Sequence, residues 1–277
     1  TRTTADEAQR LFINECDFAY HKVSTGAVSY SQAVREAIET AVSGGIYVNW
    51  TDAQGNVYHR DTIEVAVARA VRTGVAQAAG DISLKRMEEM DWDIILVSSH
   101  VGARIGDGGE NPGNHAWWQG KYYCRTGQDK RFLPFSATGY GTGEGLSGYN
   151  CRHSFGSGTG RDEDNPFSKV DTEENKRVYL LEQRQRLLER RIRHTKRDLM
   201  GWQATVEHCE DEALKADFQK TVDRKAALLK RQNEEYQAFC KQNNLRTQME
   251  RIQIAQWGRK EANKAIAAAR RYEKERT

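Results

Sequence analysis

Helix-breaking residues are nearly absent from the last two fifths of this chain. No proline follows Pro166, and only Gly201 and Gly258 interrupt the segment behind it. Because proline and glycine are the residues that helices tolerate least, this segment is predicted to be helical over most of its length. Apolar residues recur there at helical spacing in two sets. The first set is Leu181, Leu188, Ile192, Leu199, Trp202 and Val206, and the second is Leu214, Phe218, Val222, Leu229, Tyr236 and Phe239.

These two sets predict two long helices folded back as a hairpin near residues 207–212, or one interrupted arm. Asn243 and Asn244 mark the expected end of the second helix. The final stretch, 254–277, is rich in alanine, lysine and arginine, and we expect it to be helical only when bound to a partner.

Charge is divided unevenly along the chain. Residues 161–277 carry 27 Lys/Arg against 21 Asp/Glu, whereas residues 1–160 carry 15 against 18. A basic segment behind a near-neutral one favours an anionic partner, although long helices are also laced with charge for solubility. With 38% hydrophobic and 29% charged residues, the chain suits one modest core plus a solvated element. We therefore expect a module over residues 1–160 and a basic α-helical arm over residues 161–277.

The module is predicted to be α+β. A capping box at Thr4 and Glu7 begins a helix that ends near residue 23, and a second helix is expected over residues 29–42. Strands at 46–50 and 57–60 form a hairpin, a third helix runs from residue 61 to about 87, and a buried strand follows at 94–98. Residues 102–160 then hold 15 of the 23 glycines together with many aromatic residues, which predicts ordered loops and short strands.

The five cysteines are an odd number at irregular spacings, so they form no disulfide framework and a reducing compartment is expected. No run of apolar residues is long enough to span a membrane.

Histidine and cysteine gather around the glycine-rich region, at His100, His115, Cys124, Cys151 and His153. Cys151 and His153 share a face of an extended segment, because strand side chains alternate with period two. We expect His100, His115, Cys151 and His153 to hold a structural zinc ion, although their spacing is not that of a zinc finger. Buried cysteine and hydrogen-bonded histidines without metal would fit the same pattern.

Two catalytic interpretations use the same residues. Cys151 would act as a nucleophile with His100 or His153 as base, but residues two apart on a strand seldom meet in hydrogen-bond geometry. His100, His115 and Asp107 would suit a metal-dependent hydrolase. The glycine run 139–145 lacks the Lys-Ser/Thr of a phosphate-binding loop, so a tight structural loop is predicted there.

The arm contains a strongly cationic stretch at 184–197, where a single acidic residue, Glu189, faces seven cations. These are Arg184, Arg186, Arg190, Arg191, Arg193, Lys196 and Arg197. Such a stretch suits backbone-type, sequence-independent contact with DNA or an acidic protein surface. A solvated face of a helical hairpin is the alternative.

Long motifs of this chain resemble the phage minor capsid protein 2 family, a relative of the Mu-type and SPP1-type head morphogenesis proteins. They are residues 97–104, 115–121 and 140–154, with similar stretches at 66–75 and 183–193. Relatives often have Cys-Arg-Cys where this chain has Cys151-Arg152-His153, an exchange that suits a metal-binding or structural role better than a nucleophile. The segment 105–114 is longer than the family pattern, which weakens the link between His100 and His115.

The resemblance implies a non-enzymatic minor head protein, present in few copies, built into the procapsid near the portal and associated with packaged DNA or its delivery. The implied partners are portal or capsid proteins, DNA without sequence preference, and further copies of the chain, with no membrane. The expected location is the phage head, and the host cytoplasm during assembly. The family pattern also includes a helical region ahead of the position of Thr1, to which a portal-binding surface would belong. The alternative is a metal-dependent nuclease or hydrolase carried in the virion as an effector.

Overall fold

The computed structural model describes residues 2–29, 32–33, 36, 47–51, 54, 56–167, 169–208, 210 and 212–275. The chain forms two compact units, unit 1 over Thr1–Tyr179 and unit 2 over Leu180–Thr277. Unit 1 combines helices with short strands, and unit 2 is helical in the part that is described, so the predicted α+β class is confirmed. A division of the chain at residue 160 stays a prediction. None of the described helices is both long and apolar enough to cross a membrane.

Two helices pack against each other in the first part of unit 1. Helix α1 spans Arg2–Ser24 and helix α3 spans Ile63–Glu89, within a few residues of the predicted bounds. Because α1 already begins at Arg2, Thr4 and Glu7 lie inside the helix and do not form its predicted cap. Their contact is made by small and β-branched side chains, among them Ala19, Val67 and Val71, which are almost fully buried. The helix predicted over 29–42 falls largely outside the described residues.

The predicted hairpin is present between these helices. Strand β1 (Tyr47–Thr51) pairs antiparallel with β2 (Val57–Thr62), and Tyr47 faces Thr62 in the register. The register shifts between Trp50 and Thr51, as at a β-bulge. The end of β2 leads directly into α3.

A four-stranded sheet forms the centre of unit 1. It contains β3 (Ile94–Val97), β4 (Tyr122–Cys124), β5 (Leu133–Pro134) and β6 (Phe155–Ser157), in the order β5-β4-β3-β6. Strand β3 is antiparallel to both of its neighbours, and β4 and β5 are parallel. Strand β3 is one of the two inner strands, and its Ile95 and Val97 are completely buried.

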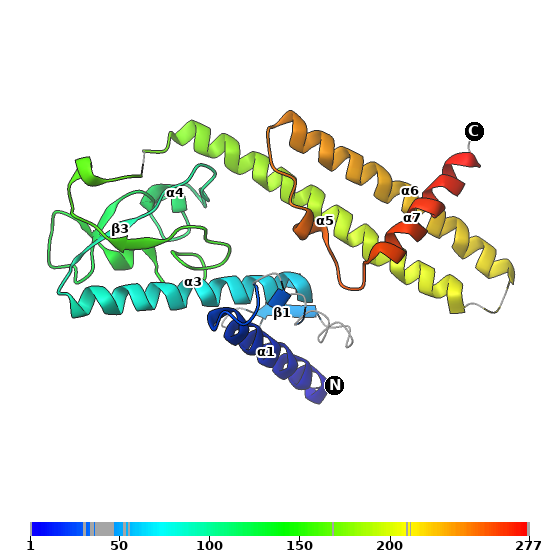
Figure 1. Cartoon of the computed structure of the whole chain (residues 1–277), viewed down its shortest axis with the longest axis horizontal. Coiled ribbons are helices and arrows are strands. Elements are labelled where there is room, and N and C mark those ends of the chain that lie inside the picture. Colours follow the sequence, from blue (N-terminus) through cyan, green and yellow to red (C-terminus); the bar gives the residue numbers. More distant parts are fainter. Residues whose placement is uncertain are drawn as a thin grey trace. The chain divides into compact units, whose positions relative to one another are not determined.

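Helix α3 lies along this sheet (Figure 1), and a glycine permits the close approach. A Cβ atom at Gly80 would overlap the Tyr140 hydroxyl and lie only 3.0 Å from the Phe155 ring. The Tyr140 hydroxyl is within hydrogen-bond distance of Gln77 O (2.9 Å) and Asp81 Oδ1 (2.7 Å). One aromatic residue of the glycine-rich region is thereby joined to the helix that precedes the sheet.

Unit 2 is built on the predicted helical hairpin. Helix α5 (Thr172–His208) and helix α6 (Glu212–Gln242) fold back on each other, since Gln185 Nε2 is 3.3 Å from Cys240 Sγ and Lys225 pairs with Asp198. Of the two predicted arrangements, the hairpin is therefore the one present. Both predicted apolar sets contribute to its core, with Leu188, Ile192, Leu199, Val222 and Leu229 buried together. Helix α6 ends just before Asn243 and Asn244, where a break is predicted.

The end of the chain differs from its prediction. Residues Met249–Ile252 form a short 3-10 helix (η3), and Arg259–Lys274 form helix α7, which packs against α6 of the same chain (Figure 1). Small side chains explain the difference, because Ala265, Ala268 and Ala269 are buried and let the two helices approach closely. Alanine, abundant in this stretch, is here a packing residue as well as a helix former.

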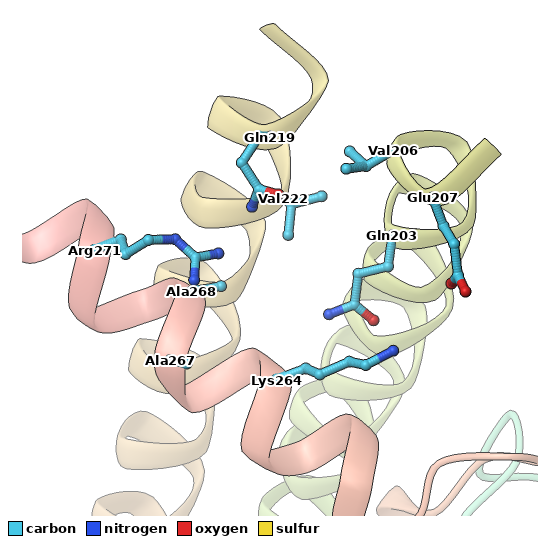
Figure 2. Close-up of a pocket in the computed structure, with 9 residues that line it drawn as sticks. All are labelled: Gln203, Val206, Glu207, Gln219, Val222, Lys264, Ala267, Ala268 and Arg271. Atoms are coloured by element: carbon cyan, nitrogen blue, oxygen red, sulfur yellow. The ribbon is translucent and has the colours of Figure 1, made fainter. Parts of the chain in front are cut away.

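An ion pair joins α7 to α6, and a small cleft lies beside it. Arg271 of α7 donates to Asp223 Oδ1 of α6 at 2.7 Å, and the Asp223 side chain is almost completely buried. Helices α5, α6 and α7 together line a cleft of about 290 Å³. Figure 2 shows its lining side chains, with Lys264 extending towards Gln203 and Glu207. Residues of α5, α6 and α7 thus pack together in unit 2.

Candidate metal centre

A four-residue helix places the first member of the site. Helix α4 spans His115–Trp118, and Asn114 caps it by accepting a hydrogen bond from the Trp117 amide at 3.2 Å. The Ala116 amide donates to Arg104 O at 2.9 Å, and the Trp118 indole donates to Pro112 O at 2.9 Å. These bonds set α4 against the loop before it, and His115 is consequently buried.

Cys151 and His153 reach the same place from the segment that leads into β6. His115, Cys151 and His153 offer ligand atoms that all lie within 4.8 Å of one another, and Cys151 Sγ is 3.6 Å from His153 Nδ1. Their exposed fractions are only 3%, 7% and 5%, respectively. These three residues are called the histidine–cysteine cluster below. The prediction that Cys151 and His153 share one face of an extended segment agrees with this arrangement.

The hydrogen bonds of the His115 and His153 rings define which ring nitrogen has a free lone pair to bind a metal ion. His115 Nε2 is 2.8 Å from Glu144 O, and His153 Nε2 is 3.0 Å from Gln119 Oε1. Both partners are carbonyl oxygens that only accept, so each neutral ring carries its proton on Nε2. The lone pair is therefore on Nδ1 in both rings. Outer hydrogen bonds of this kind orient the histidine ligands of metal sites in proteins.

Burial sets the protonation of the cluster. It lowers the pKa of His115 to about 4 and that of His153 to about 2, since an imidazolium loses its hydration there. Burial also raises the pKa of the Cys151 thiol. The histidines are neutral, as metal ligands must be, and Cys151 keeps its proton unless a cation displaces it. A buried, protonated thiol is a poor nucleophile.

The other predicted ligand, His100, lies beside the cluster. Its ring stacks on His153 with centroids 4.4 Å apart and an interplanar angle of 28°, and its Nδ1 is 3.0 Å from Val101 O. Its backbone amide donates to Gln119 Oε1, the same oxygen that accepts from His153. Among the residues that the structure describes, the group with converging ligand atoms comprises only the histidine–cysteine cluster.

Cys124 and Asp107 also lie apart from that group. Cys124, in β4, donates from Sγ to Asp93 Oδ2 at 2.9 Å. Asp107 Oδ1 accepts from the Gly109 amide and from Asn111 Nδ2, which closes an exposed turn. The structure therefore does not assemble His100, His115 and Asp107 into one group of metal ligands within its described part.

The glycine run presents Glu144 O to His115. The loop closes on itself, since the Leu146 amide donates to Thr138 O at 3.0 Å and the Gly141 amide donates to Leu146 O at 3.2 Å. A Cβ atom at Gly145 would overlap Gly139 O, so only glycine permits this backbone approach. The prediction of a tight structural loop agrees with this geometry.

Two amide side chains of unit 1 form hydrogen bonds at or near the site, and neither is among the functional residues predicted from the sequence. Gln119 links His100 and His153 through one oxygen. Asn175, in the first turn of α5, accepts from the Gly102 and Ala103 amides at 2.9 Å each and donates to Ala103 O at 3.0 Å. The one signal for Gln119 in the sequence is its place within residues 115–121, one of the motifs that resemble the family.

The seven predicted cations of the arm take different positions. Arg184, Arg190 and Arg191 are exposed, and Arg186 pairs with Glu182 at 3.4 Å. Arg197 is half-buried. Arg193 donates to Arg251 O, and Lys196 Nζ donates to Ile252 O at 2.7 Å. The single acidic residue within 184–197, Glu189, is buried next to the Tyr236 hydroxyl, and burial raises its pKa.

A family model matches most of the chain. The family model described as phage minor capsid protein 2 matches residues 1–241, which include all of unit 1 and nearly all of the α5–α6 hairpin. No curated protein and no solved structure shows a significant match.

Proposed function

Because the chain belongs to the phage minor capsid protein 2 family, we propose that it is a structural component of the phage head, bound to portal or neighbouring capsid proteins and to packaged DNA. The observation that carries this proposal is the extent of the match, which covers unit 1 and continues to residue 241 of unit 2. Burial of the histidine–cysteine cluster supports a structural role for that site, since a catalytic centre needs access for its substrate.

The experiment that tests the head assignment is quantification of the chain in purified, nuclease-treated particles by mass spectrometry. We expect a fixed, low copy number and cross-links to the portal or major capsid protein. Absence of the chain from DNA-filled particles would overturn the proposal.

For DNA, the exposed cations of α5 are the residues that favour contact. Arg190 and Arg191 are adjacent and exposed, whereas Arg193 and Lys196 are engaged by carbonyl groups. Replacing both Arg190 and Arg191 by alanine is expected to weaken binding to DNA of any sequence and to lower the slope of log affinity against log salt by about 2. Lys85 and Arg86, an adjacent exposed pair on α3, supply the matched control. Equal losses in the two double variants would contradict a specific role for the arm.

For the histidine–cysteine cluster, we propose that zinc, when bound, is held by Cys151 Sγ and the Nδ1 atoms of His115 and His153. The donor set fits zinc, which favours sulfur and imidazole nitrogen, and its Lewis acidity would stabilise the thiolate. Metal analysis of the purified chain tests the assignment, and about one zinc per chain is expected. The zinc should be lost in His115→Ala. It should be retained in His194→Ala, because His194 is an exposed histidine of α5. Removal of zinc is expected to lower the melting temperature. A catalytic turnover that disappears in His115→Ala would instead support a virion-borne hydrolase.

A further inference from the structure

Unit 2 contains a second, larger depression that the family match does not predict. A groove of about 690 Å³ opens between α6, α7 and the segment around η3. Most of its walls come from residues 249–270, beyond the matched residues 1–241. It is distinct from the small cleft of Figure 2, which lies between other faces of the same helices.

Apolar side chains form much of the groove wall. Leu229 and Ile252 lie buried at its base, and Trp257 forms part of its side. Met249 and Ile266 line it as well, although their exposed fractions are 49% and 51%. Large apolar side chains exposed around a concave surface are typical of a site that a partner covers.

A buried cation lies within these apolar walls. Lys196 is only 5% exposed, and its Nζ atom is 2.7 Å from Ile252 O and 5.2 Å from the centre of the Trp257 ring. An ammonium group has three donor hydrogens, and in the described part of the chain no carboxylate lies within ion-pair distance of it. Burial lowers the pKa of Lys196 to about 8, so the group is still mostly charged at neutral pH. A carboxylate from a partner would supply the missing countercharge.

The rim of the groove has the same sign of charge. Arg259 and Arg270 are exposed at its edge, and Lys230 is paired with Glu273 at 2.7 Å. Glu234 is the only acidic residue among those that line the groove. The surface is therefore complementary to a segment that combines apolar side chains with carboxylates. Nucleic acid fits less well, because it has no apolar side chain to cover Met249 and Ile266.

We propose that this groove binds an acidic amphipathic helix of another protein of the head. Apolar side chains of that helix cover Trp257 and Ile266, and one of its carboxylates approaches Lys196. The identity of the partner as a head protein rests on the proposed function, whereas its acidic amphipathic character rests on the groove alone. Helices laid in grooves are recognised in this way, by apolar anchors and flanking charge.

The test uses the full chain and a fluorescein-labelled synthetic helix of about 16 residues, with leucines on one face and glutamates beside them. Fluorescence anisotropy is expected to show saturable binding, weakened at least about tenfold by Ile266→Glu and by exchange of the glutamates of the peptide for lysines. Asn263→Glu adds the same charge at an exposed position of α7 outside the groove and is expected to leave binding unchanged. Ile266 is half exposed, so its variant is expected to fold, which circular dichroism checks.

Three results would overturn the proposal. Equal binding of the glutamate and lysine peptides would exclude charge recognition, and equal effects of Ile266→Glu and Asn263→Glu would place the peptide elsewhere. A dimer of the free chain that Ile266→Glu dissociates would make a second copy the occupant. These measurements are made on the isolated chain, so they fail independently of the head assignment, which the particle analysis tests.

Discussion

Replacement of Asn175 by alanine is expected to destabilise unit 1 locally. The Asn175 side chain is almost fully buried and makes three hydrogen bonds, two from the Gly102 and Ala103 amides and one to Ala103 O. Alanine removes all three and leaves the backbone partners buried and unpaired. At about 1 kcal/mol for each lost bond, the free energy of unfolding is expected to fall by about 3 kcal/mol.

Hydrogen exchange locates the effect, because the Gly102 and Ala103 amides are expected to lose most of their protection in Asn175→Ala. Urea unfolding measures its size. Asn175→Asp keeps the acceptor oxygen but loses the donor to Ala103 O, so an intermediate loss is expected. Lys176→Ala, at an exposed neighbouring position, is expected to change stability by less than about 0.5 kcal/mol. A loss below about 1 kcal/mol for Asn175→Ala, or unchanged exchange at both amides, would refute the reasoning.

Three further predictions concern glycines and a buried lysine. Gly80→Ala is expected to lower the free energy of unfolding by about 1–3 kcal/mol, because the new Cβ atom overlaps the Tyr140 hydroxyl. Gly201→Ala has open space around the new Cβ atom and is expected to raise the free energy of unfolding by up to about 1 kcal/mol. Thermal unfolding of both variants checks this. Gly145→Ala is expected to shift the backbone that holds Glu144 and to alter the His115 ring signals in NMR spectra. Burial lowers the pKa of Lys196 from 10.5 to about 8, so the unfolded chain holds this proton to higher pH than the native one. The free energy of unfolding should therefore rise between pH 8 and 10.5 by up to about 3 kcal/mol relative to Lys196→Met; parallel pH profiles of the two proteins would contradict this.

The long helices were predictable because each buries a regular apolar stripe. α1, α3, α5 and α6 all follow such a pattern. Their ends are less regular, since α1 begins at Arg2 and the capping box predicted at Thr4 and Glu7 lies inside it. Strands β4, β5 and β6 are only two or three residues long, and the three residues of β4 are all buried, so they show no alternation. The packing of helix α7 is not evident from the sequence because its buried face consists of alanine, which is too weakly hydrophobic to form a clear apolar stripe.

The candidate site was predictable in part. Cys151 and His153 share a face through the geometry of extended chain, and the convergence of His115 on them agrees with the residue types. The stacking of His100 on His153 depends on ring orientation, which no spacing rule gives. Gln119 acts through a single amide group, and one amide leaves no periodic pattern to detect.

The hydrogen bonds of Asn175 have a consequence for the order in which the protein is made. Every side chain of the histidine–cysteine cluster, with Gln119 and Glu144, precedes residue 154, whereas Asn175 comes later in the chain. Domains fold as units while synthesis proceeds from the N-terminus. The ribosome therefore delivers the complete cluster first, with the loop at Gly102 and Ala103 still without its amide partner. That loop gains its last hydrogen bonds only when the first turn of α5 has emerged, so translation of α5 completes the folding of unit 1.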